Sequence, residues 1–155
     1  MTYSVRRAVL VFAAFLGALA DPTFAAPATG ACSIMTKAEI KPFSTNRAFD
    51  QFPAEEEKEG RGSSCNYAGI YIQVDVIPFA TIETMSRDQK QRIEAVRGVG
   101  DAAYVRNNRD EYAELYARVG QRTFTVQLDI GPQETFASVR PRLMQLGTAM
   151  AAKFR

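Results

Sequence analysis

Residues 112–130, YAELYARVGQRTFTVQLDI, decide the fold class of this chain. Apolar and polar side chains alternate on both sides of Gly120 and Gln121, and a period of two is typical of half-buried β-strands. Glycine between two such runs favours a tight turn, so the stretch predicts an antiparallel hairpin. A shorter strand is expected over 102–106, before a turn at 107–110, and it extends the hairpin to a three-stranded meander.

A fourth strand and two longer helices are predicted on either side of the meander. Alternation over 70–76 predicts the strand, which Pro78 ends. Apolar residues at helical spacing predict one amphipathic helix over 79–96 and another from 136 towards the C-terminus. Gly98–Asp101 is expected to stop the first of these helices and to turn the chain into the next strand.

Helix caps and a polar stretch complete the expected elements. Thr36 and Glu39 have the spacing of a capping box, which predicts a short helix that Pro42 ends. In the C-terminal helix, Ser138 is the expected N-cap, so that Pro141 falls in the first turn. The polar residues 44–64 are expected to form a surface loop.

Each predicted strand has one apolar face, and the simplest way to bury these faces is to cover a single sheet with helices. The sequence therefore predicts an α+β fold. We expect a two-layer sandwich in which an antiparallel sheet of about four strands carries helices on one face.

The N-terminus has the pattern of an export signal. Arg6 and Arg7 precede an unbroken apolar run over 8–20, and Thr23-Phe24-Ala25 supplies the small residues that a signal peptidase needs. The run has 13 residues, whereas a helix needs about 20 to cross the bilayer core. We therefore expect cleavage after Ala25 and no stable membrane insertion afterwards.

Residues 1–25 are thus interpreted as a signal peptide, and 26–155 as a single domain of a bacterial periplasmic or secreted protein. Three other interpretations remain open. In the first, the apolar run is a permanent membrane anchor. In the second, the paired arginines belong to a twin-arginine signal, and in the third, Cys32 carries a lipid.

Composition excludes several classes of function. Without Arg6, Arg7 and Asp21, the 19 basic and 17 acidic residues of the chain become 17 and 16, so the net charge is only +1. This near balance argues against a nucleic-acid partner. The chain has no histidine, which excludes Ser-His-Asp and Cys-His catalysis and histidine-based zinc sites. We expect no cofactor, no metal and no recognisable catalytic motif, and the acidic run 55–59 is interpreted as solvated rather than as a Ca²⁺ site.

The two cysteines, Cys32 and Cys65, both lie in the part of the chain that is expected to be exported. An even number of cysteines in an oxidising compartment predicts one disulfide. The alternative is a reactive thiol, although neither cysteine belongs to a Cys-x-x-Cys motif.

The sheet face opposite the core is the candidate binding site. The side chains proposed to bind a ligand there are Tyr67, Tyr71, Gln73, Asp75, Tyr112, Tyr116 and Arg118. Their polar neighbours on the same face are Glu114, Thr125, Gln127 and Asp129. Tyrosines beside amides and carboxylates suit a sugar, a peptide or another flat polar ligand. Alternatively the face is solvated or covered by residues 44–64, or Asp75, Glu114 and Asp129 supply a catalytic carboxylate pair.

Three segments carry a resemblance: CSIMTKAEI at 32–40, CNYAGIYIQV at 65–74 and GVGDAAY at 98–104. Together with the hairpin and helix over 112–153, they make the chain similar to a loose group of uncharacterised bacterial secreted or lipoprotein-like α+β domains. The resemblance implies a relation to extracytoplasmic sensor and accessory domains. It implies no reaction and identifies no functional residue.

We therefore expect an exported, non-enzymatic domain that binds a small ligand or an envelope protein through its tyrosine-bearing sheet face. One alternative is an envelope accessory protein that uses another surface. A second alternative is a hydrolase that depends on carboxylates.

Overall fold

The computed structural model describes residues 30–88 and 92–155, so the predicted signal peptide lies outside the described residues. In chain order the elements are α1 (Ala31–Ile34), α2 (Lys37–Ile40), the 3₁₀ turns η1 (Lys41–Phe43) and η2 (Phe49–Gln51), β1 (Glu55–Glu59), β2 (Gly62–Asn66), β3 (Ile70–Val74), α3 (Phe79–Arg87), β4 (Ile93–Val96), β5 (Ala102–Asn108), β6 (Tyr112–Val119), β7 (Arg122–Asp129) and α4 (Phe136–Lys153).

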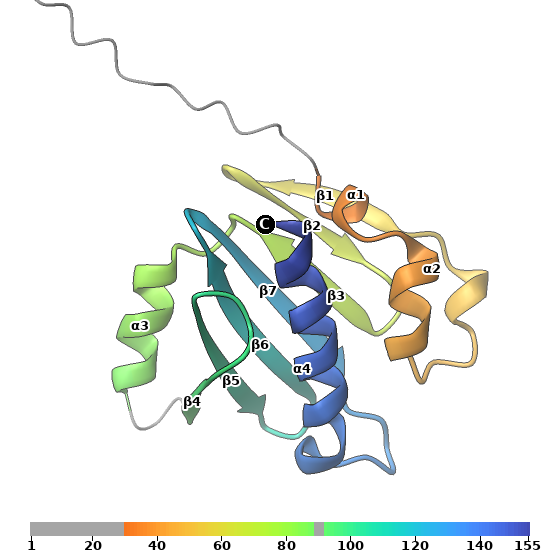
Figure 1. The fold of residues 1–155 in the computed structure, drawn as a ribbon. Helices are drawn as coiled ribbons and strands as arrows, with labels where there is room; N and C mark the ends of the chain where they lie inside the picture. The colour runs from red at the N-terminus through yellow and green to blue at the C-terminus, as the bar shows by residue number, and fades with distance from the viewer. Residues whose placement is uncertain (1–29, 89–91) are drawn as a thin grey trace, which may run out of the picture.

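One antiparallel sheet organises the molecule. Its seven strands run in the order β1-β2-β3-β7-β6-β5-β4 (Figure 1). The α+β class predicted from the sequence is confirmed, and so is the meander of β5, β6 and β7. The expected number of about four strands is too low, because β1, β2 and β4 lie in segments that were expected to be loop or helix.

The two strands β1 and β2 replace part of the loop expected over 44–64. β1 reads EEEKE, is largely exposed and contains no apolar residue that would reveal a buried face. It forms at the edge of the sheet by pairing with β2, and charged residues on an edge strand disfavour pairing with other molecules. Pairing rather than hydrophobic pattern therefore makes this segment a strand.

The helix expected over 79–96 ends earlier than predicted. α3 stops at Arg87, and 93–96 form the short edge strand β4 against β5. Ile93 and Val96 are three residues apart, so their spacing matches a helix as well as a short strand. Residues 93–96 form a strand rather than a helix because they pair with the edge of β5.

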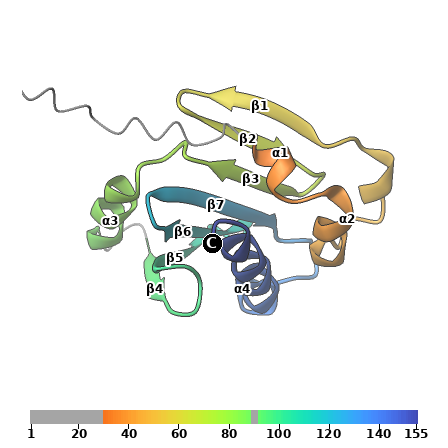
Figure 2. The same ribbon diagram turned by 45° about the horizontal axis from the view of Figure 1, so that its top comes forward.

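The main core lies on one face of the sheet. A continuous row of paired residues crosses five strands, from Cys65 in β2 through Ile72, Val126 and Leu115 to Val105 in β5. Each of these side chains is at most 1% exposed. α1 and α4 cover this face, and their residues belong to the same buried cluster (Figure 2).

α4 approaches the sheet closely at Gly147. A Cβ atom at this position would lie 2.8 Å from Leu115 Cδ2, which is closer than two carbon atoms in contact normally come. Leu143 and Leu146 of the same helix are fully buried. Glycine therefore lets the helix axis lie near the middle strand of the meander.

α3 packs on the opposite face of the sheet, which corrects the expectation that all helices share one face. The Phe79 ring lies 5.7 Å from that of Tyr104, and the Arg118 guanidinium lies 5.2 Å from the Phe79 ring centre. Phe79, Ile82 and Tyr116 are buried but do not belong to the main core. The apolar side of α3 needs a second hydrophobic surface, and the tyrosines of β5 and β6 provide it.

One of the two predicted helix caps is confirmed and the other is shifted. Thr36 and Glu39 form the predicted capping box of α2, and a 3₁₀ turn containing Pro42 follows it. The N-cap of α4 is Thr135, not Ser138, because the two hydroxyl side chains bond reciprocally to each other's backbone N–H. Pro141 therefore lies in the second turn instead of the first.

The predicted disulfide is confirmed and links α1 to β2. Cys32 and Cys65 are bonded, with their Cα atoms 5.1 Å apart. The Ala31 N–H also donates a hydrogen bond of 2.7 Å to Ser63 Oγ. The disulfide indicates a non-reducing, extracytoplasmic environment. Among the residues that the structure describes, no helix is long and apolar enough to cross a membrane.

Removal of the disulfide is expected to destabilise the protein strongly. The two cysteines are separated by 33 positions in the chain, and a loop of this length predicts a loss of about 3–4 kcal/mol for Cys32→Ala/Cys65→Ala. Chemical denaturation with and without dithiothreitol measures this loss. The reductant should destabilise the wild type and leave the double variant unchanged; equal stability of the two proteins would contradict the prediction.

Candidate functional site

The register of the strands brings most of the predicted site residues to one face of the sheet. We call this face, opposite α4, the tyrosine face. Tyr71, Gln127, Glu114 and Arg106 follow one another in a row across β3, β7, β6 and β5. In the next row Gln73 and Tyr116 are each paired with Thr125. Alternation along the strands therefore predicted correctly that these side chains share one face of the sheet.

α3 covers the β5–β6 side of the tyrosine face and closes it. Tyr116 is only 3% exposed and Glu114 only 7%. The Tyr116 hydroxyl donates a 2.8 Å hydrogen bond to the Glu114 carboxylate, with which Arg106 also forms an ion pair. Burial, followed by the nearby Glu114 charge, raises the pKa of Tyr116. These groups satisfy one another and leave no room for a ligand.

The β3 side of the tyrosine face is more open. Tyr71 donates a 2.5 Å hydrogen bond to Glu59, and the Gln73 amide donates to the other oxygen of the same carboxylate at 3.0 Å. Hydrogen bonds from Ser64, Tyr71 and Gln73 lower the pKa of Glu59. A hollow of about 340 Å³ lies beside Tyr71 and extends to Gln127 and Asp129.

Tyr67 does not lie on the tyrosine face, contrary to the prediction. Its side chain is 2% exposed and belongs to the main core, where its hydroxyl donates a 2.7 Å hydrogen bond to the Met35 carbonyl. Tyr67 directly follows β2 and lies two positions after Cys65, so its side chain points to the same face of the sheet as that of Cys65. The turn at Ala68 and Gly69 then shifts the alternation, so that Tyr67 and Tyr71 point to opposite faces.

Asp75 also leaves the predicted site. Its φ angle of 54° ends the alternation of β3. The carboxylate instead accepts hydrogen bonds from Arg122 and from the Thr123 N–H. Asp129 is the last residue of β7 and lies six positions after Thr123. Six residues of a strand span about 20 Å. Asp75 is therefore too far from Asp129 for the two to act as a catalytic pair.

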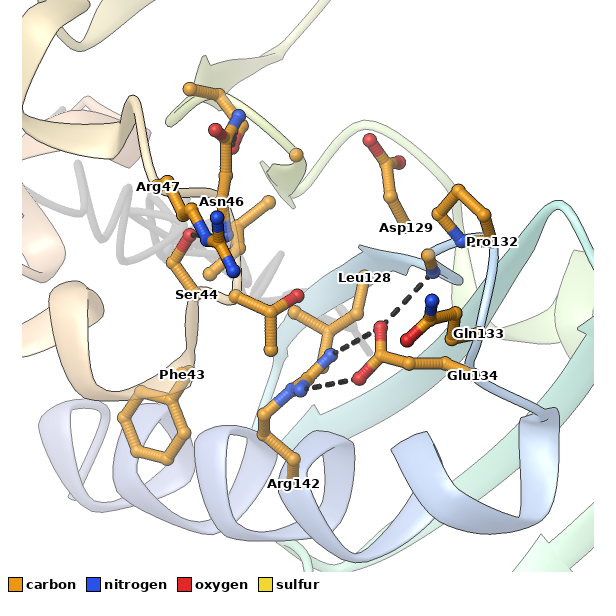
Figure 3. A pocket seen from close by; sticks show the side chains of 15 residues that line it. Phe43, Ser44, Asn46, Arg47, Leu128, Asp129, Pro132, Gln133, Glu134 and Arg142 are labelled. Carbon is orange, nitrogen blue, oxygen red and sulfur yellow. Dashed lines mark hydrogen bonds and ion pairs between the residues drawn. The ribbon is translucent and has the colours of Figure 1, made fainter.

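A cavity of the described chain lies where β3 begins and β7 ends. It has a volume of about 660 Å³ (Figure 3). We name it the Arg142 cavity. It is lined by Phe43, Ser44, Thr45, Asn46, Arg47, Ala68, Gly69, Ile70, Leu128, Asp129, Gly131, Pro132, Gln133, Glu134 and Arg142. Four separate segments contribute these residues, and no periodic pattern in the sequence connects the segments.

Arg142 reaches from α4 into the wall of this cavity and is held by Glu134. Two hydrogen bonds of 2.9 and 3.4 Å join the guanidinium to the carboxylate, which also accepts the Gly131 N–H at 3.0 Å. The hydrogen bond from Arg142 is the main reason why the pKa of Glu134 is lowered. The Nε atom of Arg142 is buried and has no hydrogen-bond acceptor among the described residues.

Two further charged side chains stand on opposite walls of the cavity, Arg47 on one and Asp129 on the other (Figure 3). Neither forms an ion pair with a described residue. Partial burial raises the pKa of Asp129. Ile70 and Leu128 also line the cavity, but they are only 2% and 1% exposed.

The turn between β2 and β3 shapes the rim of this cavity. Gly69 has a φ of 95°, and a Cβ atom there would lie 3.3 Å from the Asp129 carboxylate. Gly69 also lines the hollow beside Tyr71 and a third hollow of about 250 Å³ beside Phe52. The sequence signal that points to this place is the Ala68-Gly69 pair between two alternating strands.

The described part of the chain contains no group of three acidic or cysteine side chains that would hold a metal ion. No family model matches this protein, and neither a curated protein nor a solved structure matches it significantly. The fold and the cavity define an α+β protein with a surface cavity, lined by charged, polar and apolar side chains, at one end of an antiparallel sheet.

The two tyrosines Tyr116 and Tyr71 are expected to differ in their contribution to stability. Tyr116→Ala removes a buried ring and leaves Glu114 without one of its hydrogen bonds, so we expect a loss of about 3 kcal/mol or more. Tyr71→Ala affects a half-buried side chain and should cost less than about 1.5 kcal/mol. Denaturant unfolding of both variants measures the two losses, and equal values would contradict the assignment of Tyr116 to the scaffold.

Tyr67 is expected to make the protein sensitive to alkaline pH. Burial, with the charges of Glu56 and Glu39, raises the pKa of Tyr67 to about 12, from about 10 in an unfolded chain. Folding therefore opposes ionisation, and the stability that the neutral phenol contributes is lost as the pH rises from 10 through 12.

Alkaline unfolding followed by circular dichroism, together with phenolate absorbance, tests this assignment. Tyr67→Phe should show a shallower loss of stability between pH 10 and 12 than the wild type. An unchanged pH dependence would show that Tyr67 ionises without opposition from the fold.

Proposed function

We propose that the protein is an exported, non-catalytic binding domain that holds a small ligand in the Arg142 cavity. The observation that carries the proposal is a cavity of about 660 Å³ whose walls carry Arg47 and Asp129, two charged side chains that form no ion pair with a described residue. Ligand sites typically have volumes of about 300–1,000 Å³.

The chemistry of the cavity supports binding rather than catalysis. Histidine is absent from the chain, and Glu134 is engaged by Arg142 and the Gly131 N–H. The lowered pKa of Glu134 makes its carboxylate a weak base. The Ser44 hydroxyl oxygen accepts the Asn46 N–H and has no base beside it that would activate it as a nucleophile.

In this proposal, only the β3 side of the tyrosine face contributes to ligand binding. The hollow beside Tyr71 shares Gly69, Ile70 and Asp129 with the Arg142 cavity. A ligand that extends beyond the cavity would therefore meet Tyr71 and Gln127. Tyr116 and Arg118 support α3 instead of contacting the ligand.

An envelope accessory role is the second candidate, and a different surface favours it. Phe52 is 53% exposed, and it is the one exposed large apolar residue among the described residues. It lies beside the hollow that contains Pro53, Glu55 and Asn66. A protein partner would use this side chain, whereas a ligand in the Arg142 cavity would not need it.

Ligand binding is tested with a variant that fills the cavity. Gln133 is exposed, lines the cavity and has no side-chain hydrogen bond to a described residue, so Gln133→Trp should block the cavity without unfolding the protein. The matched control is Gln121→Trp, in the hairpin turn at the far end of β7. Thermal unfolding is measured for both variants and the wild type against a library of small polar metabolites.

A ligand present at about one hundred times its Kd stabilises a protein by about 2.7 kcal/mol. We therefore expect compounds that raise the Tm of the wild type and of Gln121→Trp by several degrees, but not that of Gln133→Trp. Equal shifts in all three proteins, or no shift with any compound, would refute the proposed cavity. A partner whose binding is lost in Phe52→Ser and retained in Gln133→Trp would favour the accessory role.

A further inference from the structure

The charges of the Arg142 cavity fall into one compensated pair and two uncompensated groups. Arg142 and Glu134 neutralise each other through two hydrogen bonds. Arg47 and Asp129 remain, and neither has an oppositely charged partner among the described residues. The net charge of the lining is therefore zero, but one positive and one negative side chain have no oppositely charged partner among the described residues.

The positions of these two groups restrict the shape of a ligand. Arg47 lies on the wall formed by the segment after α2, and Asp129 lies on the opposite wall at the end of β7 (Figure 3). Leu128 is placed between them, and the lining also includes the apolar side chains of Phe43 and Pro132. A complementary ligand carries a cation at one end, an anion at the other and an apolar group in the middle.

We propose that the ligand is a short peptide with free termini, whose carboxylate binds Arg47 and whose ammonium group binds Asp129. This inference rests on the proposed function, because it names the ligand of the same cavity. A guanidinium group binds a carboxylate through two parallel hydrogen bonds, and a carboxylate suits a compact ammonium group. An apolar side chain of the peptide packs on the apolar part of the cavity lining.

The uncharged polar groups of the cavity suit a peptide backbone. The Gln133 amide is free to donate to one peptide group and to accept from another. An extended chain advances about 3.3–3.6 Å per residue, so two or three residues hold the terminal ammonium and carboxylate groups apart, whereas a single amino acid keeps its two charges close together.

Other classes of ligand fit this lining less well. A phosphorylated or multiply acidic ligand would find only one uncompensated cation, Arg47, and would leave Asp129 without a counterion. A neutral sugar would leave Arg47 and Asp129 without counterions. Partial burial raises the pKa of Asp129, which indicates that its charged form lacks stabilisation in the empty cavity and that a cation would supply it.

The proposal is tested with tripeptides and the purified protein with its disulfide intact. Native mass spectrometry with a mixture of free tripeptides first selects the best-bound sequence. Isothermal titration then compares this tripeptide with its N-acetylated and C-amidated forms. We expect each blocked form to bind at least about tenfold more weakly, because each has lost one of its two charges.

Two conservative variants identify the residues that bind the two ends. Arg47→Gln should weaken the free tripeptide at least about tenfold but leave the residual affinity of the C-amidated form unchanged. Asp129→Asn should do the same for the free and the N-acetylated forms. Arg61→Gln and Glu57→Gln, at exposed positions outside the cavity lining, are the matched controls and should bind the free tripeptide as the wild type does.

The outcomes separate the peptide proposal from the proposed function. Equal binding of free and blocked tripeptides, or full affinity in both cavity variants, overturns the assignment of the termini. Failure of every tripeptide overturns the peptide proposal. The proposed function survives that failure if metabolites from the library still stabilise the wild type but not Gln133→Trp, and it falls if none of them does.

Discussion

The row of buried residues that crosses the sheet from Cys65 through Ile72, Val126 and Leu115 to Val105 is the constraint on which the other features depend. All five side chains point to the same face because the four strand pairings keep one register. A slip of one residue in any pairing would move the apolar side chains of that strand to solvent. The cost of such a slip fixes the sheet, and α4 covers the row with a close approach at Gly147.

The same register determines which strand ends lie side by side, and the cavity lies where β3 begins and β7 ends. β3 begins at Ile70 beside the position where β7 finishes, and the segment after α2 closes around this corner. The disulfide and the Ala31–Ser63 hydrogen bond hold the N-terminal segment against β2. The apolar core therefore positions polar loops that have little hydrophobic surface of their own.

Stability and binding use different groups in this molecule. Tyr67 and Tyr116 are buried, and their hydroxyl groups have protein partners, so these two tyrosines belong to the scaffold. Arg47 and Asp129 stand at the cavity without charged partners, and folding does not require their charges. This separation is typical of binding sites, in which a rigid scaffold holds the side chains that contact the ligand. It also explains why the tyrosine-rich surface, although conspicuous in the sequence, offers a ligand little space.

The sequence alone determined the α+β class, the meander, the capping box of α2 and the disulfide, because alternation, cap spacing and a single pair of cysteines are local or countable signals. It did not reveal β1, β2 or β4, since EEEKE has no apolar period and Ile93 and Val96 fit a helix as well as a strand. It also placed Tyr67 on the wrong face, because the turn at Ala68 and Gly69 shifts the phase of the alternation. Only the tertiary structure decided where the Arg142 cavity lies. Its lining comes from four segments that pattern within the chain does not connect, and the packing of the sheet against α4 brings them together.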